Sequence, residues 1–169
     1  MMWTLFFKLA GALVIVACGW LAGSGGASSL RTKRMFYEDM IELCELLQNN
    51  VAYQRDPLPV FFARETQGRQ FSVLRFDTRG LEEFASWRTR FLSDTLARLS
   101  LSPHEQSVFH EFFLGLGNGS AQEECGRLHY YGALFASAQE EARKKERECA
   151  RLYRSLGVCA GLTAAILLF

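Results

Sequence analysis

Residues 121–169 decide the fold of this chain, and they read AQEECGRLHYYGALFASAQEEARKKERECARLYRSLGVCAGLTAAILLF, with no proline among them. Apolar residues recur along this stretch at spacings of three and four, which is the period of one helical face. These residues are Leu128, Tyr131, Phe135, Ala138, Ala142, Cys149, Leu152 and Leu156, with Lys145 as the one exception. Because proline would break the backbone hydrogen bonds of a helix, its absence predicts one continuous helix of about 50 residues.

A second stripe of the same period lies nearer the N-terminus and predicts a helix over residues 29–53. Its apolar positions are Leu30, Tyr37, Met40, Cys44, Leu47 and Val51, and Lys33 is the one interruption. Each apolar stripe must pack against another apolar surface to be buried away from water. We therefore expect the two long helices to pack against each other in antiparallel directions.

The residues between these stripes carry clear signals for helix starts and ends. Asp56-Pro57-Leu58-Pro59 ends the first helix and starts a short one that reaches Thr66, because proline suits only the first turn of a helix. Two capping boxes, Ser102–Glu105 (SPHE) and Ser120–Glu123 (SAQE), predict the starts of two further helices. Gly117-Asn118-Gly119 predicts the turn between them.

Residues 67–80 leave two interpretations open. Phe71, Val73 and their neighbours fit a strand by alternation, and they also fit an irregular or helical connector. A single strand would have no partner for its backbone hydrogen bonds, so the connector is favoured. The next stretch, residues 81–99, returns to the helical period.

Both ends of the chain are strongly apolar. Met1–Ala22 carries one charged side chain, Lys8, and a helix of about 20 residues spans the hydrocarbon core of a bilayer. A cleaved signal sequence with a lipoprotein-like Cys18 is the alternative for this segment. Residues 155–169 form a second apolar stretch, at the short limit for a span. The predicted fold is all-α: a membrane-anchored helical bundle with a long C-terminal helix and a transmembrane segment at each end.

The predicted domains are an N-terminal transmembrane helix (1–22), a cytoplasmic helical bundle (23–154) and a C-terminal transmembrane helix (155–169). Basic residues flank both spans on the side of the bundle, which by the positive-inside preference puts the bundle in the cytoplasm. They are Arg31, Lys33, Arg34, Arg143, Lys144, Lys145, Arg147, Arg151 and Arg154. Small residues let membrane helices approach closely, and the candidates for such packing are Gly11, Gly19, Gly157 and Gly161.

The polar part of the chain is electrically balanced. Between Ser24 and Arg154 there are 18 basic and 18 acidic side chains, so the net charge is 18 − 18 = 0. This balance excludes a nucleic-acid binder that works by bulk charge. The five cysteines are odd in number and form no CxxC pair, which indicates free thiols in a reducing compartment.

No cluster of residues has the spacing of a catalytic or metal site. His104 and His110 are six residues apart and fall on different faces of a helix, while His129 lies on another helix. Gly115–Gly119 lacks both the lysine and the strand–turn–helix setting of a phosphate loop. We therefore expect no enzymatic activity, no cofactor, no metal ion and no small-molecule substrate.

Four stretches of the chain resemble the stage III sporulation protein AB family of endospore-forming bacteria. They are the N-terminal apolar segment with the basic residues after it, Asp56-Pro57-Leu58-Pro59, Phe112–Gln122 and Leu152–Gly157. The last contains a Tyr-Arg-Ser-Leu-Gly run directly before an apolar tail and is the most specific. The resemblance extends nearly from end to end, although residues 68–80 match none of these motifs.

The resemblance implies a helical bundle similar to the cytoplasmic domains of type II secretion platform proteins. It implies a non-enzymatic membrane scaffold in a secretion-like channel between mother cell and forespore, located in the mother-cell membrane that faces the forespore. The implied partners are the membrane and other channel proteins, with a motor ATPase among the candidates and no nucleic acid. A surface lipoprotein with an outward-facing helical binding domain is the alternative function.

Binding energy at protein interfaces concentrates in a few residues, so a scaffold needs a small exposed docking surface. We expect this surface at the end of the bundle that faces away from the membrane. The candidate docking residues are Arg55, Asp56, Gly117, Asn118, Gly119 and Ser120.

Overall fold

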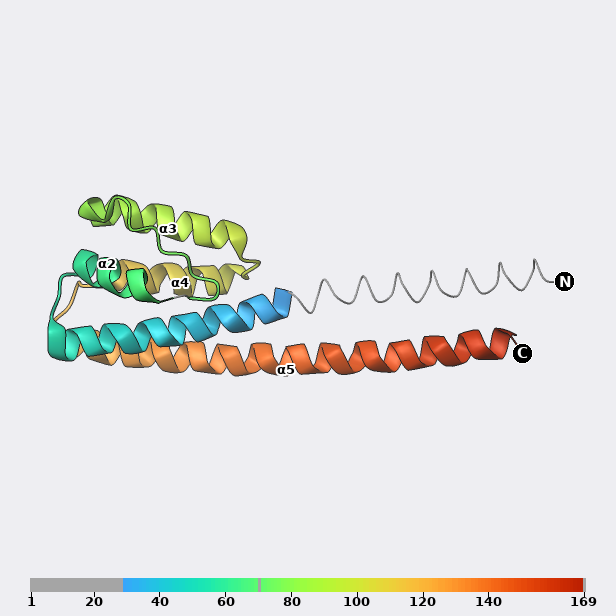
Figure 1. Ribbon diagram of the computed structural model, residues 1–169. Helices are drawn as coiled ribbons and strands as arrows, with labels where there is room; N and C mark the ends of the chain where they lie inside the picture. The colour runs from blue at the N-terminus through green and yellow to red at the C-terminus, as the bar shows by residue number, and fades with distance from the viewer. Residues whose placement is uncertain (1–28, 70, 169) are drawn as a thin grey trace. The chain divides into compact units, whose positions relative to one another are not determined.

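The computed structural model describes residues 29–69 and 71–168, with the side-chain surroundings of all of these except 66–68, 150 and 153–168 (Figure 1). Every regular element in this part of the chain is a helix, so the all-α fold class is confirmed. The chain divides into two compact units, one formed by Thr32–Glu141 and one that combines Met1–Arg31 with Ala142–Phe169. The bundle described below is the unit Thr32–Glu141.

The bundle begins with a helix over residues 29–49, which we call the 29–49 helix. The elements that follow are η1 (Asn50–Gln54), α2 (Leu58–Gly68), η2 (Leu81–Glu83), α3 (Phe84–Arg98), α4 (Pro103–Gly115) and α5 (Ala121–Leu168). The predicted helices over 29–53, 58–66 and 81–99 are therefore confirmed with small shifts in their ends. The connector interpretation of residues 67–80 is also confirmed in the described part, since residues 69 and 71–80 form no strand.

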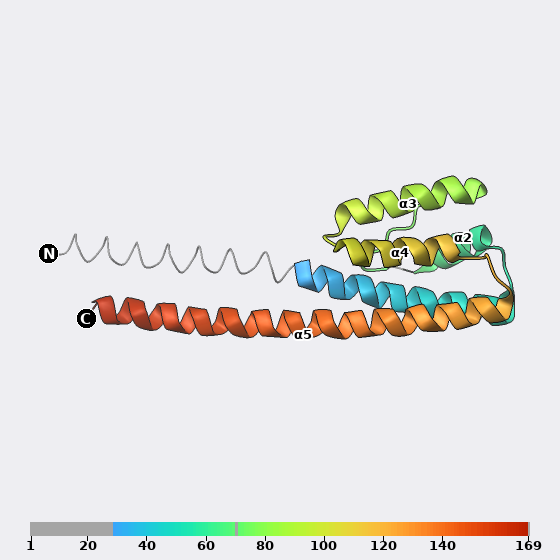
Figure 2. The ribbon, with the colours of Figure 1, turned by 180° about the vertical axis from the view of Figure 1, so that it is seen from behind.

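The predicted long C-terminal helix is present as α5, a single helix of 48 residues. Within the bundle it packs antiparallel to the 29–49 helix, as expected from the two apolar stripes (Figures 1 and 2). The Tyr37 ring stacks on Phe135 with 6.4 Å between centroids. Further along, Gly132 of α5 lies opposite Cys44 of the 29–49 helix, where a Cβ on the glycine would be 3.8 Å from the Cβ of Cys44, an ordinary packing distance.

The core of the bundle is unusually aromatic, because the chain contains 14 phenylalanines and most of those described are buried. Ring contacts link the helices in series. Phe91 of α3 meets Phe113 of α4 at 5.1 Å, and Phe112 of α4 meets Phe135 of α5 at 5.7 Å. Such pairs add roughly 0.5–1.5 kcal/mol each beyond the burial of their area, so α3, α4 and α5 are held together largely by these rings.

A buried carboxylate shapes the irregular connector between α2 and α3. Asp39 of the 29–49 helix is 4% exposed, and its two carboxylate oxygens accept the backbone N–H groups of three successive residues. The donors are Ser72 at 3.0 Å, Val73 at 2.6 Å and Leu74 at 2.9 Å. These bonds replace the ladder that a strand partner would have provided, and they hold the connector against the 29–49 helix.

Both predicted capping boxes are formed. At the start of α4, the Glu105 carboxylate accepts the Ser102 backbone N–H at 2.6 Å, and the Ser102 hydroxyl accepts the Glu105 N–H at 3.4 Å. At the start of α5, Ser120 and Glu123 make the same reciprocal pair at 2.8 Å and 3.4 Å.

Glu105 also explains why Lys33 interrupts the apolar stripe of the 29–49 helix. The Lys33 ammonium donates to both carboxylate oxygens of Glu105, at 3.0 Å and 2.7 Å, and the Tyr37 hydroxyl donates to one of them at 2.6 Å. Burial alone would raise the pKa of the Glu105 carboxyl, but the bonds from Lys33, Tyr37 and Ser102 lower it to about 2. A lysine in the stripe thus ties the 29–49 helix to the first turn of α4.

None of the helices in the described part of the chain is long and apolar enough to cross a membrane. The predicted span over Met1–Ala22 lies outside the described residues, as do the side chains of residues 153–169. Both spans and the domain boundaries at residues 22 and 154 stay predictions.

Candidate docking surface

The two loops that carry the predicted docking residues lie at the same end of the bundle (Figures 1 and 2). One loop, residues 55–57, connects η1 to α2, and the other, residues 116–120, connects α4 to α5. The second loop lies against the first residue of α2, directly after the first loop, because a Cβ on Gly117 would be only 3.1 Å from the Cδ1 of Leu58. The structure thus brings together two predicted segments that are about 60 residues apart in sequence.

The first loop is shaped by a buried asparagine. Asn50 is 3% exposed; its side-chain amide donates to the Asp56 carbonyl at 3.0 Å, and its Oδ1 accepts the Asp56 N–H at 3.3 Å. Between them, Arg55 adopts a left-handed conformation with φ 56°, and its N–H donates to the Asn50 carbonyl at 2.6 Å. This closure turns the chain out of the 29–49 helix and leaves the Arg55 side chain exposed.

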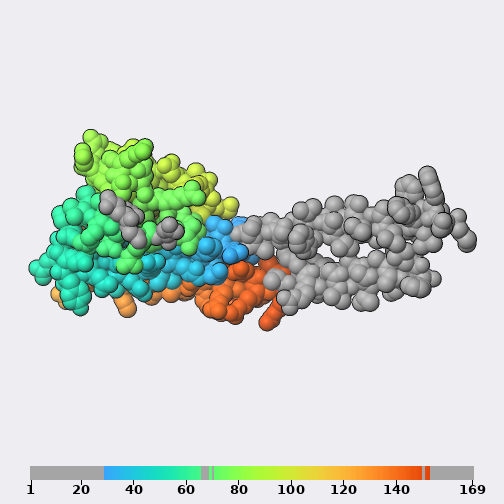
Figure 3. Space-filling model, in the orientation of Figure 1, coloured from blue at the N-terminus to red at the C-terminus, as the bar shows by residue number. Residues whose placement is uncertain are grey.

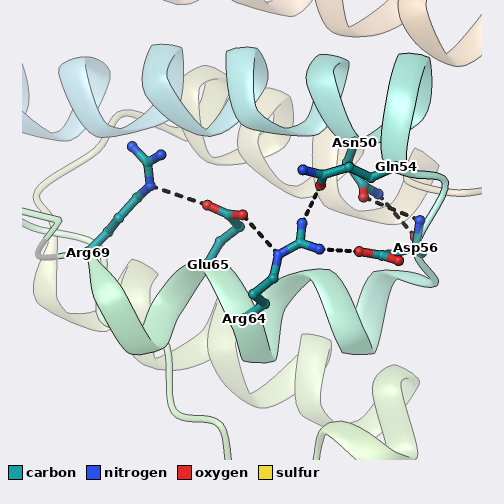
Figure 4. A network of polar contacts seen from close by, with 6 residues as sticks. All are labelled: Asn50, Gln54, Asp56, Arg64, Glu65 and Arg69. Atoms are coloured by element: carbon teal, nitrogen blue, oxygen red, sulfur yellow. Dashed lines mark hydrogen bonds and ion pairs between the residues drawn. The ribbon is translucent and has the colours of Figure 1, made fainter.

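Arg64 of α2 then fastens the loop from below (Figure 4). Its guanidinium donates to the Asp56 carboxylate, to the Gln54 side-chain oxygen and, at 3.1 Å, to Glu65. Glu65 in turn accepts from Arg69 at 3.2 Å. The Asp56 carboxylate is therefore engaged within the bundle.

Arg55 differs from Asp56 in this respect. No hydrogen bond or ion pair of its guanidinium is found among the residues that the structure describes, so it is the charged group of the loop that is available to a partner. Of the two charged residues predicted here, the structure places Arg55 in solvent and Asp56, half-buried, in an internal ion pair.

The second loop depends on glycine at two positions. Gly117 has φ 80°, a left-handed conformation that side chains disfavour, and its N–H donates to the Glu124 carboxylate at 3.2 Å. A Cβ on Gly115 would overlap the Arg127 guanidinium, which pairs with the same Glu124 at 2.5 Å. These contacts hold the inner side of the loop against α5. Asn118, Gly119 and Ser120 remain exposed on its outer side.

Three exposed apolar side chains accompany these loops, and sequence reasoning missed all three. They are Tyr53 at 84% exposure, Val60 at 51% and Leu114 at 42%, each within about one helical turn of a loop. Val60 directly precedes the buried Phe61, and Leu114 directly follows the buried Phe113, so the sequence shows an apolar run with no sign of which member faces water. Tyr53 lies outside the apolar stripe predicted over residues 29–53. That position was the one feature of the sequence that indicated an exposed ring.

We define the end surface as Tyr53, Arg55, Val60, Leu114 and residues 118–120. In the space-filling view, the chain segment that precedes α2 is teal and lies at one end of the bundle (Figure 3). The end surface combines a tyrosine, two aliphatic side chains and an arginine that has no ion pair among the described residues, all beside the two loops. Tyrosine and arginine are enriched in the residues that dominate binding energy at protein interfaces.

The described residues contain no cluster of three or more His, Cys, Asp or Glu side chains that could hold a metal ion. His104, His110 and His129 are all exposed on α4 and α5. Cys44 is buried, and Cys125 and Cys149 are half-buried free thiols. Burial, assisted by the charge of Glu45, raises the pKa of the Cys44 thiol to about 12, so this cysteine is a core residue and no nucleophile.

The four glycines predicted to pack membrane helices lie outside the residues whose side-chain surroundings the structure describes. Gly11 and Gly19 lie outside the described residues, and Gly157 and Gly161 lie in the part of α5 whose side-chain surroundings are not described. Their role stays a prediction.

The model of the family described as stage III sporulation protein AB matches residues 8–169. The description names a stage of sporulation and no enzymatic activity. No curated protein and no solved structure matches the chain.

Proposed function

We propose that this chain, which belongs to the stage III sporulation protein AB family, serves sporulation as a non-enzymatic scaffold that docks other proteins through the end surface of its helical bundle. The observation that carries the proposal is the convergence of two loops, distant in sequence, around exposed Tyr53 and around Arg55, whose guanidinium has no ion pair among the described residues. The chain holds both loops in position through hydrogen bonds of Asn50, Arg64 and Glu124.

In this proposal the scaffold is anchored in a membrane at both ends and belongs to a secretion-like channel complex between mother cell and forespore. The apolar segments Met1–Ala22 and 155–169, with basic residues flanking both on the side of the bundle, support the anchoring and a cytoplasmic bundle. The family membership supports the assignment to sporulation. Other channel proteins, a motor ATPase among them, are the partners that we propose for the end surface.

The test is affinity purification of the intact chain from membranes of sporulating cells, followed by identification of the proteins that accompany it. We compare wild type with the double variant Tyr53→Ser, Arg55→Glu. A matched control, Tyr130→Ser with Arg147→Glu, changes the same residue types at exposed positions of α5. We expect the end-surface variant to lose its partners and to form few spores, while the control retains both and each variant keeps its helix content.

Two results would overturn the proposal. Equal loss of partners in the control would mean that the end surface has no special role. An outside signal from a reporter fused at Gly119 would reverse the orientation and favour the surface lipoprotein instead, as would a mature chain that begins at a lipidated Cys18.

A further inference from the structure

A second surface, separate from the end surface, is a cleft between the connector and α3. Its volume is about 490 Å³, and it lies within the bundle unit. Buried Trp87 and Phe91 of α3 line it together with four exposed arginines, Arg75, Arg79, Arg90 and Arg98. We call these four residues and the two rings the arginine cleft.

The connector is fixed to α3 by contacts that leave the arginines pointing away from the core. The Trp87 indole N–H donates to the Asp77 carbonyl, and the Phe76 ring stacks on Phe91 at 4.8 Å. On its other side the connector is bound by Asp39 through the three N–H groups described above. Arg75 and Arg79 are therefore held on one wall, while Arg90 and Arg98 lie two helical turns apart on the other.

Among the described residues, the arginines of this cleft have no acidic partners, whereas several other arginines of the bundle do. Arg34, Arg64 and Arg127 each form an ion pair. For the four cleft arginines, no ion pair is found within residues 29–69 and 71–168, and the one side-chain bond runs from Arg98 Nε to the Asp94 carbonyl at 3.1 Å.

The cleft is positive within a bundle unit that is acidic as a whole, since residues 32–141 carry 11 basic and 16 acidic side chains, a net charge of 11 − 16 = −5. Four arginines face only two lining carboxylates, Asp77 and Asp94, which leaves an excess of 4 − 2 = 2 positive charges. A guanidinium presents a planar fork of donors that fits a carboxylate in two parallel hydrogen bonds. The charge thus favours an anionic occupant.

The backbone of the connector adds a second kind of unused donor. The N–H groups of Phe76, Asp77 and Thr78 make no hydrogen bond within the described residues, and the chain here is neither helix nor strand. A segment outside helices and strands whose N–H groups are unused can pair with an extended chain, as in recognition by strand addition.

We propose that the arginine cleft binds an extended, acidic segment of a partner protein. Acidic side chains spaced along such a segment can each meet one arginine, while its backbone pairs with residues 76–78. A compact anion such as phosphate fits less well, because Asp77 and Asp94 stand among the arginines and would repel a charge concentrated at one point. The proposal goes beyond the docking role of the end surface and does not depend on it, since it rests on different residues.

The test uses the full-length chain in a non-ionic detergent and a fluorescein-labelled peptide of alternating glutamate and threonine as the probe. Fluorescence anisotropy should show binding that weakens with added salt, and the corresponding glutamine–threonine peptide should not bind. The triple variant Arg75→Gln, Arg79→Gln, Arg98→Gln should bind the acidic peptide about tenfold more weakly. Asp94→Asn should bind it roughly twofold to fivefold more tightly, because a repelling carboxylate is removed.

The matched control is Lys144→Gln, Arg147→Gln, Arg151→Gln, which removes the same charge from exposed positions of α5. Equal weakening in the control would reduce the binding to bulk attraction and overturn the proposal. Displacement of the peptide by submillimolar inorganic phosphate, or by vesicles rich in phosphatidylglycerol, would overturn it in favour of a phosphate or a lipid site.

Hydrogen exchange of the amides of residues 76–78 gives an independent readout. Bound peptide should slow their exchange, and binding that leaves them unprotected would refute the strand-addition geometry. Circular dichroism checks that each variant is folded. If the triple variant loses helix content, peptide binding by the single variants Arg75→Gln and Arg79→Gln is the deciding measurement. Neither guanidinium makes a hydrogen bond among the described residues, so these variants should stay folded.

Discussion

Replacing Asp39 by asparagine, a side chain of nearly the same shape, should weaken the attachment of the connector to the 29–49 helix. The carboxylate accepts three backbone N–H bonds, of which the one from Leu74 is fully buried. The amide of the Asp39→Asn variant has a single oxygen, so at best it keeps the bonds from Val73 and Leu74 as neutral ones. Its NH₂ group then faces the N–H of Ser72.

The expected loss follows from these contacts. One hydrogen bond to a charged group is removed, worth roughly 1.5–3 kcal/mol, and two others fall to neutral strength. Relief from burying a charge offsets part of this, and Ser72 is exposed enough to bond water. We expect the free energy of unfolding to fall by about 2 kcal/mol. Asp39→Ala, which leaves the buried Leu74 N–H without an acceptor, should lose about 3–4 kcal/mol.

The assay is urea unfolding of the full-length chain in detergent, followed by the helical circular dichroism signal. Asp94→Asn is the matched control, because Asp94 is exposed and no described bond uses its carboxylate; its stability should change by less than about 0.5 kcal/mol. Amide exchange of residues 72–74, measured under native conditions, should accelerate in Asp39→Asn alone. The reasoning is refuted if that variant unfolds like wild type and those amides stay protected.

Three further predictions concern single residues. Glu105→Gln should cost about 1–2 kcal/mol at pH 7, a figure reduced for partial exposure of the carboxylate. The folded pKa of about 2 lies below the ordinary 4.5, so the carboxylate stabilises the fold above pH 4.5 and loses this effect as the pH falls toward 2. The difference in unfolding free energy between wild type and variant should therefore narrow over that interval. A constant difference would contradict the ion pair. Gly117→Val should lower the free energy of unfolding by roughly 1–3 kcal/mol in thermal unfolding, because valine disfavours φ 80° and would crowd Leu58. Gly117→Asn should lower it clearly less. Equal decreases for the two variants would argue against backbone strain. Cys44 should resist iodoacetamide at pH 8 in the folded chain and react in urea, as read by peptide mass mapping, with the half-buried Cys125 reacting faster in the folded state; similar rates for both thiols would show that Cys44 is accessible.

Local signals in the sequence were sufficient for the helices and their starts. The proline-free stretch from Ala121 predicted α5, and the serine–glutamate pairs at 102/105 and 120/123 predicted both capping boxes. Each of these features depends on residues three or four positions apart, so the information lies within one or two helical turns. The family could likewise be recognised from short motifs, because they stand in a fixed order along the chain.

The tertiary structure alone decided the features that join distant residues. Nothing near Asp39 indicates that its carboxylate binds the backbone of residues 72–74, and nothing near Lys33 indicates Glu105 as its partner. The same is true of the end surface, where Leu58 meets Gly117, and of the arginine cleft, where Arg75 and Arg98 face one space. The sequence shows only that a polar side chain needs a hydrogen-bond partner or water. The packing of the aromatic core decides which residues lie opposite it, and so which partner it has.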